Sequence, residues 1–585
     1  MTNRFLIAAA LCLMPAAWAQ SGGGAAAGAD TPAEAGIPVT DPLVISRCGT
    51  CHTRDAKGNM TRISWERTTP EGWEEAIKRM VRLNGLTITP TEARSILKYL
   101  ATYHGLAPDE AKAVMYVPEH RLVDESSIPN NTVHDTCANC HALGRALSWR
   151  RTKSDWQLLV NMHTFLYPQA DNIFRHGSGA FPDVRGPGAR RRGESEEAAK
   201  TPEREPVQTS IDFLAKAAPL HTTEWATWRA RMRAPKLAGK WLVSADLPGH
   251  GRYYGEMEIT AGSSDDEFTT KINLKSIKDG STLSRTGSGL VYAGYAWRGR
   301  SSAAAKGGDS PDSLSHDMRE ALWFNPNQLD AMGRWYWGAY QEFGMDVKLV
   351  RASADPAVIG VDVTSLKAGS TGAKVRLIGN NFPSKVEPSD LDLGAGVTVT
   401  RVLSSKPGEI DAEVNVASDA VSGKRDVAFR QAVLQNGIAV YDRIDYIKVT
   451  PETALAHLGS ETHPKGYQQF EAVAYNRGAD GKAHTADDVD LGPIDVTWSV
   501  EEFQSVYGDD DKGFVGQLSP TALFDPASDG PNPERKFSRN NYGNVWVVAT
   551  SKTEKEKDGR PMTGKSYLVV TVPTYIKWDQ PEVEK

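Results

Sequence analysis

The chain has 585 residues, of which 40% are hydrophobic, and it carries a formal net charge of -6 at pH 7. A chain of this length is expected to contain roughly four domains. The composition excludes the strongly basic surface that is typical of nucleic-acid binding, because the basic cluster at residues 190–192 is followed at once by glutamates.

The first 19 residues have the pattern of a secretory signal. Arg4 precedes an apolar run over residues 5–17, and Ala17-Trp18-Ala19 provides the small residues of a cleavage site. The run is too short to span a bilayer, and no later segment approaches about twenty uncharged apolar residues. We therefore predict a signal peptide over residues 1–19, which contains Cys12, and a flexible leader over residues 20–40. We also predict no membrane span and a periplasmic location.

Two Cys-x-x-Cys-His motifs contain all four cysteines of the mature chain. They are Cys48-Gly-Thr-Cys51-His52 and Cys137-Ala-Asn-Cys140-His141. This spacing is typical of c-type haem, because two thiols add to the two vinyl groups of the porphyrin and the adjacent histidine binds the iron. A zinc site is one alternative, but it would leave the histidine after each cysteine pair unexplained. A redox-active dithiol is another, but it would not need two copies. We predict two covalently bound haem c groups, with His52 and His141 as iron ligands.

The sequence after each haem motif repeats, which indicates a duplicated haem module. Residues 64–68 read Ser-Trp-Glu-Arg-Thr, and residues 148–152 read Ser-Trp-Arg-Arg-Thr. Each phrase precedes an amphipathic helical pattern with three residues on one face, namely Trp73, Ile77 and Met80 in the first copy and Trp156, Val160 and His163 in the second. A closing helix follows in each copy, over residues 93–106 and 207–220. This order is typical of the small all-helical cytochrome c fold.

Aligning the two copies places Met80 at the position of His163, and we predict both as second iron ligands. The first haem is then bound by His52 and Met80, and the second by His141 and His163. Because a thioether ligand raises the haem potential relative to a second imidazole, electrons are expected to run from the second haem to the first. The alternative is that Met80 is a core methionine and His163 a surface histidine. Other candidates are Met60, Met115, His104, His120 and His134 at the first haem, and Met162, His176 and His221 at the second.

From about residue 237, helical periodicity gives way to alternating β-branched and aromatic segments, which is the pattern of antiparallel strands. Residues 237–352 are expected to form a small barrel, residues 353–449 an immunoglobulin-like sandwich and residues 450–585 a second sandwich. With a haem domain over residues 41–236, the predicted fold is an all-α di-haem cytochrome c domain followed by three all-β domains. No Ser-His-Asp order, phosphate loop or His-Glu-x-x-His motif stands out, so we predict no catalytic residue in this chain.

This order of parts resembles the large di-haem α subunit of quinohemoprotein amine dehydrogenase. The likeness covers essentially the whole mature chain, including both haem motifs and the segments Gly239-Lys240-Trp241, Gly379-Asn380-Asn381-Phe382 and Thr485-Ala486-Asp487-Asp488-Val489-Asp490-Leu491-Gly492. The resemblance implies a heterotrimer with a β-propeller subunit and a small subunit whose cysteine tryptophylquinone oxidises primary amines. It also implies that electrons pass from the quinone through both haems to a soluble copper protein or cytochrome, with the second haem nearest the quinone. The cysteine content of the mature chain agrees with a quinone on another subunit. All four cysteines belong to the haem motifs, which leaves no thiol for a quinone cross-link.

Two other functions fit the same residues. One is a free-standing di-haem cytochrome c whose β domains are binding modules, and the other is a di-haem peroxidase-like enzyme. Exposed aromatic residues on the barrel would favour the first, whereas a broad apolar face able to receive other chains would favour the dehydrogenase subunit. The peroxidase would require a haem with an open sixth position.

Overall fold

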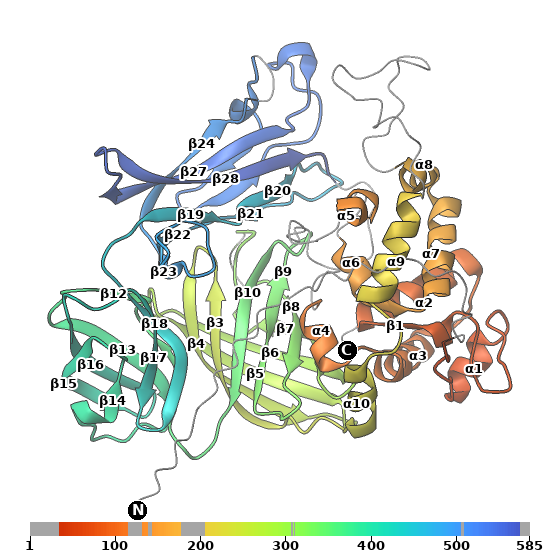
Figure 1. The fold of residues 1–585 in the computed structure, drawn as a ribbon, viewed down its shortest axis with the longest axis horizontal. Helices are drawn as coiled ribbons and strands as arrows, with labels where there is room; N and C mark the ends of the chain where they lie inside the picture. Colours follow the sequence, from red (N-terminus) through yellow and green to blue (C-terminus); the bar gives the residue numbers. More distant parts are fainter. Residues whose placement is uncertain are drawn as a thin grey trace, which may run out of the picture. The chain divides into compact units, whose positions relative to one another are not determined.

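In the part of the chain that the structure describes, the α-helices lie within the first 231 residues, and strands predominate after them (Figure 1). The computed structural model describes residues 34–114, 131–137, 143–176, 205–305, 308, 310–504 and 508–573. The predicted signal peptide and the motif residues Cys140 and His141 lie outside the described residues. No helix in the described ranges is both long enough and apolar enough for a membrane crossing.

Each haem module consists of a short helix, a longer helix and a closing helix. The helices are α1 (Pro42–Cys48), α2 (Pro70–Asn84), α3 (Pro90–Tyr103), α4 (Pro108–Lys112), α5 (Asn131–Cys137), α6 (Gly144–Leu147), α7 (Lys153–Leu166), α8 (Pro168–His176), α9 (Pro206–Ala217) and α10 (Thr223–Arg231). Helices α1, α2 and α3 of the first module correspond to α5, α7 and α9 of the second. The predicted duplication is therefore visible in the order of the helices.

A short antiparallel ribbon joins the two modules through the repeated phrases themselves. Strand β1 (Glu66–Thr68) pairs with β2 (Trp149–Arg151), so that Glu66 faces Arg151 and Arg67 faces Arg150. In the repeat, Glu66 corresponds to Arg150 and Arg67 to Arg151. If the two copies are exchanged, the pair of Glu66 and Arg151 becomes the pair of Arg150 and Arg67. The modules are therefore related by a local two-fold rotation at this ribbon.

The second domain is a closed barrel of eight antiparallel strands in which each strand pairs with its neighbours in sequence and the last closes on the first. The strands are β3 (Gly239–Leu247), β4 (Gly251–Ala261), β5 (Glu267–Ser276), β6 (Thr282–Tyr292), β7 (Ala296–Ala303), β8 (Met318–Phe324), β9 (Asp330–Trp337) and β10 (Phe343–Arg351). Alternate side chains point inward along each strand. Trp241, Trp297 and Trp335 are fully buried within this core. The predicted barrel is confirmed.

Two further β domains follow, each with its own apolar core. The third domain contains β11 (Ala357–Val361), β12 (Ser365–Lys367), β13 (Ala373–Asn380), β14 (Leu391–Asp392), β15 (Val397–Lys406), β16 (Glu409–Val416), β17 (Gly423–Phe429) and β18 (Ala432–Tyr441), in two four-stranded sheets. The fourth contains β19 (Tyr446–Thr450), β20 (Thr453–His457), β21 (Gln468–Gln469), β22 (Glu471–Asn476), β23 (Val489–Pro493), β24 (Val496–Glu502), β25 (Gly516–Leu518), β26 (Leu523–Pro526), β27 (Gly543–Lys555) and β28 (Pro561–Thr571). The predicted fold class, a helical haem domain followed by three β domains, is confirmed.

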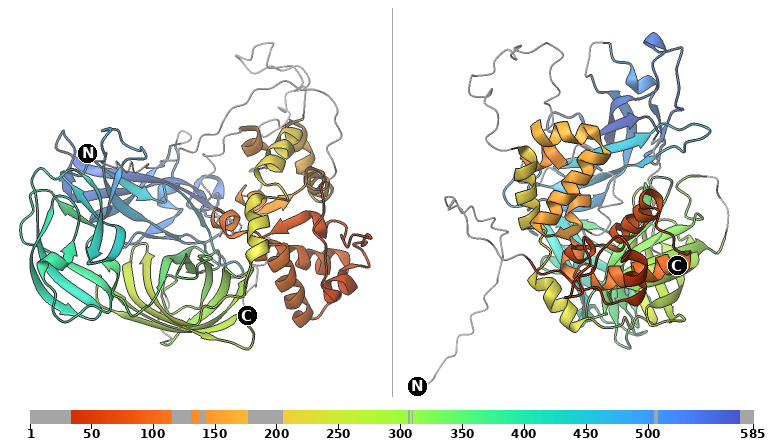
Figure 2. Two further views of the ribbon diagram at one scale, coloured as in Figure 1. Left: turned by 60° about the horizontal axis from the view of Figure 1, so that its bottom comes forward. Right: turned by 90° about the vertical axis from the view of Figure 1, so that its right-hand side faces the viewer.

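The first haem module packs on the outer surface of the barrel, and Figure 2 shows its helices beside the barrel strands. Arg298 of β7 forms a buried ion pair with Glu71, in the first turn of α2. The hydroxyl of Tyr295 donates to the carbonyl of Leu106 at 3.0 Å, and Nε1 of Trp323 donates to the carbonyl of Pro108 at 2.9 Å. These contacts fix α2 and the end of the first module against the barrel.

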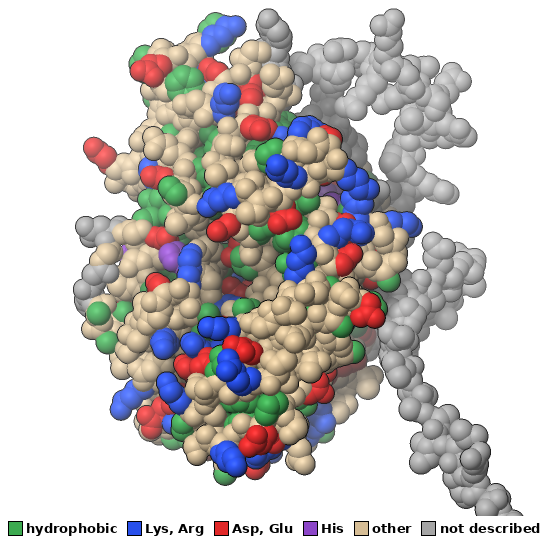
Figure 3. Space-filling model, turned by 90° about the vertical axis from the view of Figure 1, so that its left-hand side faces the viewer, with side chains coloured by type: hydrophobic (Ala, Val, Ile, Leu, Met, Phe, Trp, Pro, Cys, Tyr) green, Lys and Arg blue, Asp and Glu red, His purple; other side chains and the backbone are tan. Residues whose placement is uncertain are grey.

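Charged side chains of both signs are interspersed over the face of the molecule drawn in Figure 3. Lys and Arg side chains on this face are separated by Asp and Glu side chains and by uncharged surface. This face therefore presents no extended field of one sign that would steer a highly charged ligand.

Candidate haem sites

The first attachment motif begins at the last residue of α1. Asp41 caps this helix by accepting the backbone N–H of Val44 at 2.9 Å. The backbone N–H groups of Cys51 and His52 both donate to the carbonyl of Cys48, at 3.2 and 2.9 Å, and this turn fixes the spacing of the motif. Gly49 is required within it, since a Cβ atom there would lie 2.4 Å from the carbonyl oxygen of Ile45.

His52 is held in the orientation expected of an iron ligand. Its Nδ1 lies 2.8 Å from the carbonyl oxygen of Thr61. A ring nitrogen that bonds to a carbonyl carries the proton, which leaves Nε2 as the nitrogen with a lone pair for a metal. Burial raises the pKa of the Cys48 thiol to about 11, with the nearby Cys51 adding to the effect.

Helix α2 carries the predicted ligand Met80 and packs toward the attachment motif. Thr69 caps the helix by accepting the N–H of Gly72, and Pro70 occupies its first turn, as the sequence predicts. Trp73 and Ile77 belong to the same apolar core as Cys48, and Met80 is half-buried. Two of the three residues of the predicted face therefore pack in the core that includes the first cysteine of the motif.

In the second module, Cys137 is the last residue of α5, as Cys48 is the last residue of α1. Cys137 packs in one apolar core with Trp156 and Val160 of α7, whereas Cys48 belongs to a different core. Burial raises the pKa of the Cys137 thiol to about 11. The described cysteines of the two motifs therefore belong to separate sites, which argues against one zinc ion bound by both cysteine pairs.

His163 of α7 is half-buried and oriented like His52. Its Nδ1 lies 2.8 Å from the carbonyl oxygen of Leu159, one turn earlier, so Nε2 is again the nitrogen that suits a metal. Its ring packs against Tyr167 and Phe174, with centroids 6.2 and 6.1 Å away. These contacts show that His163 is not a free surface side chain, and its role as the second iron ligand stays a prediction.

The competing candidates are placed differently. His104 is fully buried beside Trp73, and burial together with the charges of Arg229 and Arg67 lowers its pKa to about 3. Met60 is wholly buried in the first core, and His134 is exposed beside Asp135 on α5. Met162 is half-buried on α7, and His221 is exposed at the start of α10. Met115, His120 and the side chain of His176 lie outside the described residues.

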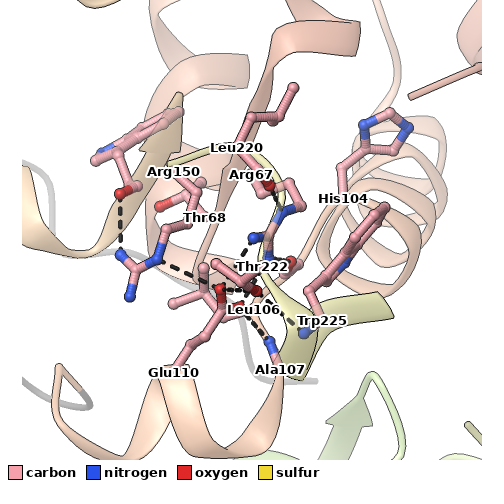
Figure 4. A network of polar contacts seen from close by, with 12 residues as sticks. Arg67, Thr68, His104, Leu106, Ala107, Glu110, Arg150, Leu220, Thr222 and Trp225 are labelled. Carbon is pink, nitrogen blue, oxygen red and sulfur yellow. Dashed lines mark hydrogen bonds and ion pairs between the residues drawn. The ribbon is translucent and has the colours of Figure 1, made fainter. Parts of the chain in front are cut away.

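A buried ion-pair network joins the two modules at the ribbon (Figure 4). Arg67 is wholly buried and makes a bidentate bond to Glu110 of α4, with distances of 2.8 and 2.9 Å. It also donates to the carbonyl of Leu220 at 2.7 Å and lies over the ring of Trp225. Nε of Arg150 lies 3.5 Å from the same carboxylate. Glu110, which lies outside the repeat, therefore compensates the charges of both Arg67 and Arg150, which face each other in the ribbon.

The other side of the ribbon has a second charge cluster. Arg151 forms ion pairs with Glu66, at 2.7 Å, and with Asp155, while Arg62 lies 3.1 Å from Asp155. Burial alone would raise the pKa of Glu66, but the charges of Arg151 and Arg62 lower it. Burial and the charge of Glu66 raise the pKa of Asp155 to about 6. Asp155 is therefore the carboxylate of this cluster that takes up a proton first as the pH falls.

The stability of the haem domain should depend on Asp155 between about pH 4 and pH 6. Because the folded-state pKa is raised above the unfolded value of 3.8, the contribution of Asp155 is fully present at low pH and is lost as the pH rises through about 6. As the pH rises through that range, the free energy of unfolding of Asp155→Asn should increase relative to that of the wild type, because the variant has no carboxyl group to lose this contribution. Denaturant unfolding at a series of pH values measures it. Asp212→Asn, at a half-exposed ion pair with Lys153, is the control. Parallel stability curves for the wild type and Asp155→Asn would refute this assignment.

Comparison with protein families finds four models that match successive parts of the chain. The model of the haem-binding domain of quinohemoprotein amine dehydrogenase A, alpha subunit, matches residues 39–174. Models of domains II, III and IV of the same alpha subunit match residues 234–352, 355–442 and 447–583. The matches follow one another in the family's own domain order and together cover most of the chain.

Other comparisons add little. No curated protein matches the chain. Among solved structures, a redesigned β-barrel is 14% identical with a TM-score of 0.17 and covers 20% of this chain and 92% of that chain. Human protocadherin-24 EC1-2 is 14% identical with a TM-score of 0.14 and covers 39% of this chain and 98% of that chain. These scores are too low to support an argument.

Proposed function

The chain belongs to the family of quinohemoprotein amine dehydrogenase alpha subunits, and we propose that it is the electron-transfer subunit of such a complex. In this proposal, haem c is bound covalently at Cys48 and Cys51 and again at Cys137 and Cys140. Electrons arrive from a cysteine tryptophylquinone on a small partner subunit and leave to a soluble copper protein or cytochrome. A β-propeller subunit completes the heterotrimer, and the predicted signal peptide supports a periplasmic location.

The observation that carries this proposal is the orientation of His52 behind its pair of cysteines. The carbonyl of Thr61 fixes the ring tautomer, and the backbone turn at Cys48 fixes the distance from the thiols to the ring. His163 has the same tautomer on the ligand helix of the second module. The attachment turn at Cys48 and the orientation of His52 therefore suit one iron porphyrin, and Cys137 and His163 are the described residues that would hold a second one.

Two haems supply two one-electron carriers, which matches the two electrons released when an amine is oxidised to an imine. The chain's own residues would hold these carriers, with Cys48 and Cys137 each packed against an apolar core. Trp73 and Trp156, almost fully buried at equivalent positions of α2 and α7, form the apolar support of the two ligand helices. The ribbon and its ion pairs fix the two modules relative to each other, so that the distance between the carriers is constant.

The proposal is tested by purifying the native complex and mixing it anaerobically with a primary amine. We expect the chain to co-purify with a quinone-bearing subunit and its haem absorption bands to become reduced on addition of the amine. Isolation of this chain alone, with no quinone-bearing partner and no amine-dependent haem reduction, would reject it. Full six-coordination of both irons in the resting and reduced states would also argue against a peroxidase.

Replacement of Met80 by histidine should lower the potential of the first haem. The thioether favours the reduced iron more than an imidazole does, and axial ligands set haem potentials over a range of about 0.8 V. We expect a decrease on the order of 0.1 to 0.3 V in a spectroelectrochemical titration, with the second haem unchanged. Met60→Leu, a substitution of similar volume in the first core, is the matched control and should leave both potentials unchanged. If Met60→Leu lowers the potential and Met80→His does not, Met60 is the ligand.

A further inference from the structure

Arg79 of α2 is a half-buried cation to which the described residues offer no partner. It directly precedes Met80 on this helix. Within the described ranges, no hydrogen bond or ion pair joins its guanidinium to another residue. Burial is the largest cause that lowers the pKa of this group. A guanidinium nevertheless keeps its charge and its five donors in a protein, and a charge removed from water requires a partner.

The charges around Arg79 do not compensate it. Glu66 and Glu75 attract it, but Arg151 and Arg145 repel it and lower its pKa further. Both carboxylates already serve other arginines, since Glu66 lies 2.7 Å from Arg151 and Glu75 lies 3.6 Å from Arg145. On this side of the ribbon the described residues contain four arginines, Arg62, Arg79, Arg145 and Arg151, and three carboxylates, Glu66, Glu75 and Asp155. Arg79 is the arginine of this set that makes no ion pair with a described residue.

Arg79 lies where the apolar cores of the two modules meet. Ala76, one helical turn before Arg79, packs against the core that includes Cys48 and also against the core that includes Cys137. Leu147 of α6 packs against both cores as well. Trp73 of the first core and Trp149 of the second have ring centroids 6.0 Å apart. The uncompensated charge therefore adjoins the cores that hold the first cysteine of each motif.

We propose that Arg79 binds a propionate of one of the two haems at this junction. Haem that is attached through its vinyl groups keeps two propionate carboxylates, and arginine forms bidentate hydrogen bonds with carboxylates. A propionate therefore supplies the anion that the described residues lack. Arg79 is then a positioning residue, and its charge also favours the reduced haem, because reduction lowers the positive charge of the iron. This inference rests on the proposed function, because it needs haem c at the motifs.

The test compares Arg79→Gln, Arg79→Lys and Arg82→Gln in the full holo chain by spectroelectrochemical titration. We expect Arg79→Gln to make reduction of one haem less favourable by roughly tenfold, which is about 59 mV for one electron. The haem whose potential falls is the one that provides the propionate. Arg79→Lys keeps the charge and should retain a potential close to that of the wild type. Arg82→Gln is the matched control, because it removes the same charge from an exposed position one turn further along α2.

Resonance Raman spectra of the same variants show whether the contact is direct. The propionate bending band of one haem should shift in Arg79→Gln and stay in place in Arg82→Gln. If the potentials and this band are unchanged in Arg79→Gln, Arg79 binds no propionate, and the proposed function stands. An equal fall in potential in Arg82→Gln, or in Arg79→Lys, would assign the effect to net charge or to a disturbance of α2 beside Met80, and would also overturn the inference. If the wild-type chain carries no covalent haem, both proposals fail.

Discussion

Replacing both Cys48 and Cys51 by alanine will leave the chain with one covalent haem instead of two and will stop amine-driven reduction of the external acceptor. Without the two thioether bonds, His52 is the only residue of the motif that can hold the first haem, and the site should lose it during secretion and purification. We expect the haem content to fall from about two to about one per chain. Turnover with an amine and a soluble acceptor should fall by about a hundredfold or more, because electrons reach the second haem and have no exit.

The control for this prediction comes from the chain itself. Cys12→Ala changes the remaining cysteine, which lies in the predicted signal peptide, and should leave both haem content and turnover unchanged. The alkaline pyridine spectrum measures covalent haem, and the chain concentration measures the stoichiometry. A double variant that still carries two covalent haems, or turns over at the wild-type rate, would contradict the assignment of Cys48 and Cys51.

The second large effect is expected at the ribbon between the modules. Arg67→Met leaves the buried carboxylate of Glu110 without its bidentate partner, and removing one member of a buried ion pair typically costs about 3 to 5 kcal/mol. We expect a loss of this size in the free energy of unfolding of the haem domain, followed by the haem absorption during denaturant unfolding. The double variant Arg67→Met with Glu110→Leu should recover only part of the loss, since it removes both charges of this pair but leaves the buried Arg150 without the same carboxylate. Arg47→Ala, at a partly exposed ion pair with Glu92, should leave stability almost unchanged.

The same pair predicts how stability changes with pH. Burial alone would raise the pKa of Glu110, but the hydrogen bonds and charge of Arg67 lower it below its usual value. A carboxylate with a lowered folded-state pKa stabilises the protein above its unfolded pKa, and this contribution is lost as the pH falls through the folded value. Arg67→Met should therefore flatten the acid limb of the stability curve. An unchanged acid limb, or a loss no larger than that of Arg47→Ala, would show that the pair does not stabilise the junction.

The helical modules and the ligand helices could be predicted from sequence because their signals are local. Thr69 and Pro70 begin α2, Thr152 begins α7, and one spacing of apolar residues recurs in both copies. The cysteine motifs are equally local, since a few residues contain the whole pattern. The barrel strands could also be predicted, because the alternation of apolar and polar residues along a strand can be read without knowing which strands it pairs with.

The ribbon and its charge clusters were not predicted. The repeated phrases around Trp65 and Trp149 are short, and their pairing with each other brings together residues about 83 positions apart. Glu110 lies outside the repeat, so no comparison of the copies points to it. The one available signal was that arginines stand in both repeated phrases, Arg67 in the first and Arg150 and Arg151 in the second. Arginines that become buried require carboxylates. Contacts with the barrel, such as that of Glu71, are likewise set by the tertiary fold.

The proposed electron-transfer function depends most directly on covalent haem at both motifs. The decisive measurement is the mass of the purified mature chain under denaturing conditions, together with its absorption in alkaline pyridine. We predict a mass that exceeds the polypeptide by two haem groups and a spectrum of thioether-bound porphyrin at two haems per chain. A colourless chain with the mass of the bare polypeptide would contradict the haem assignment and the proposed path of electrons.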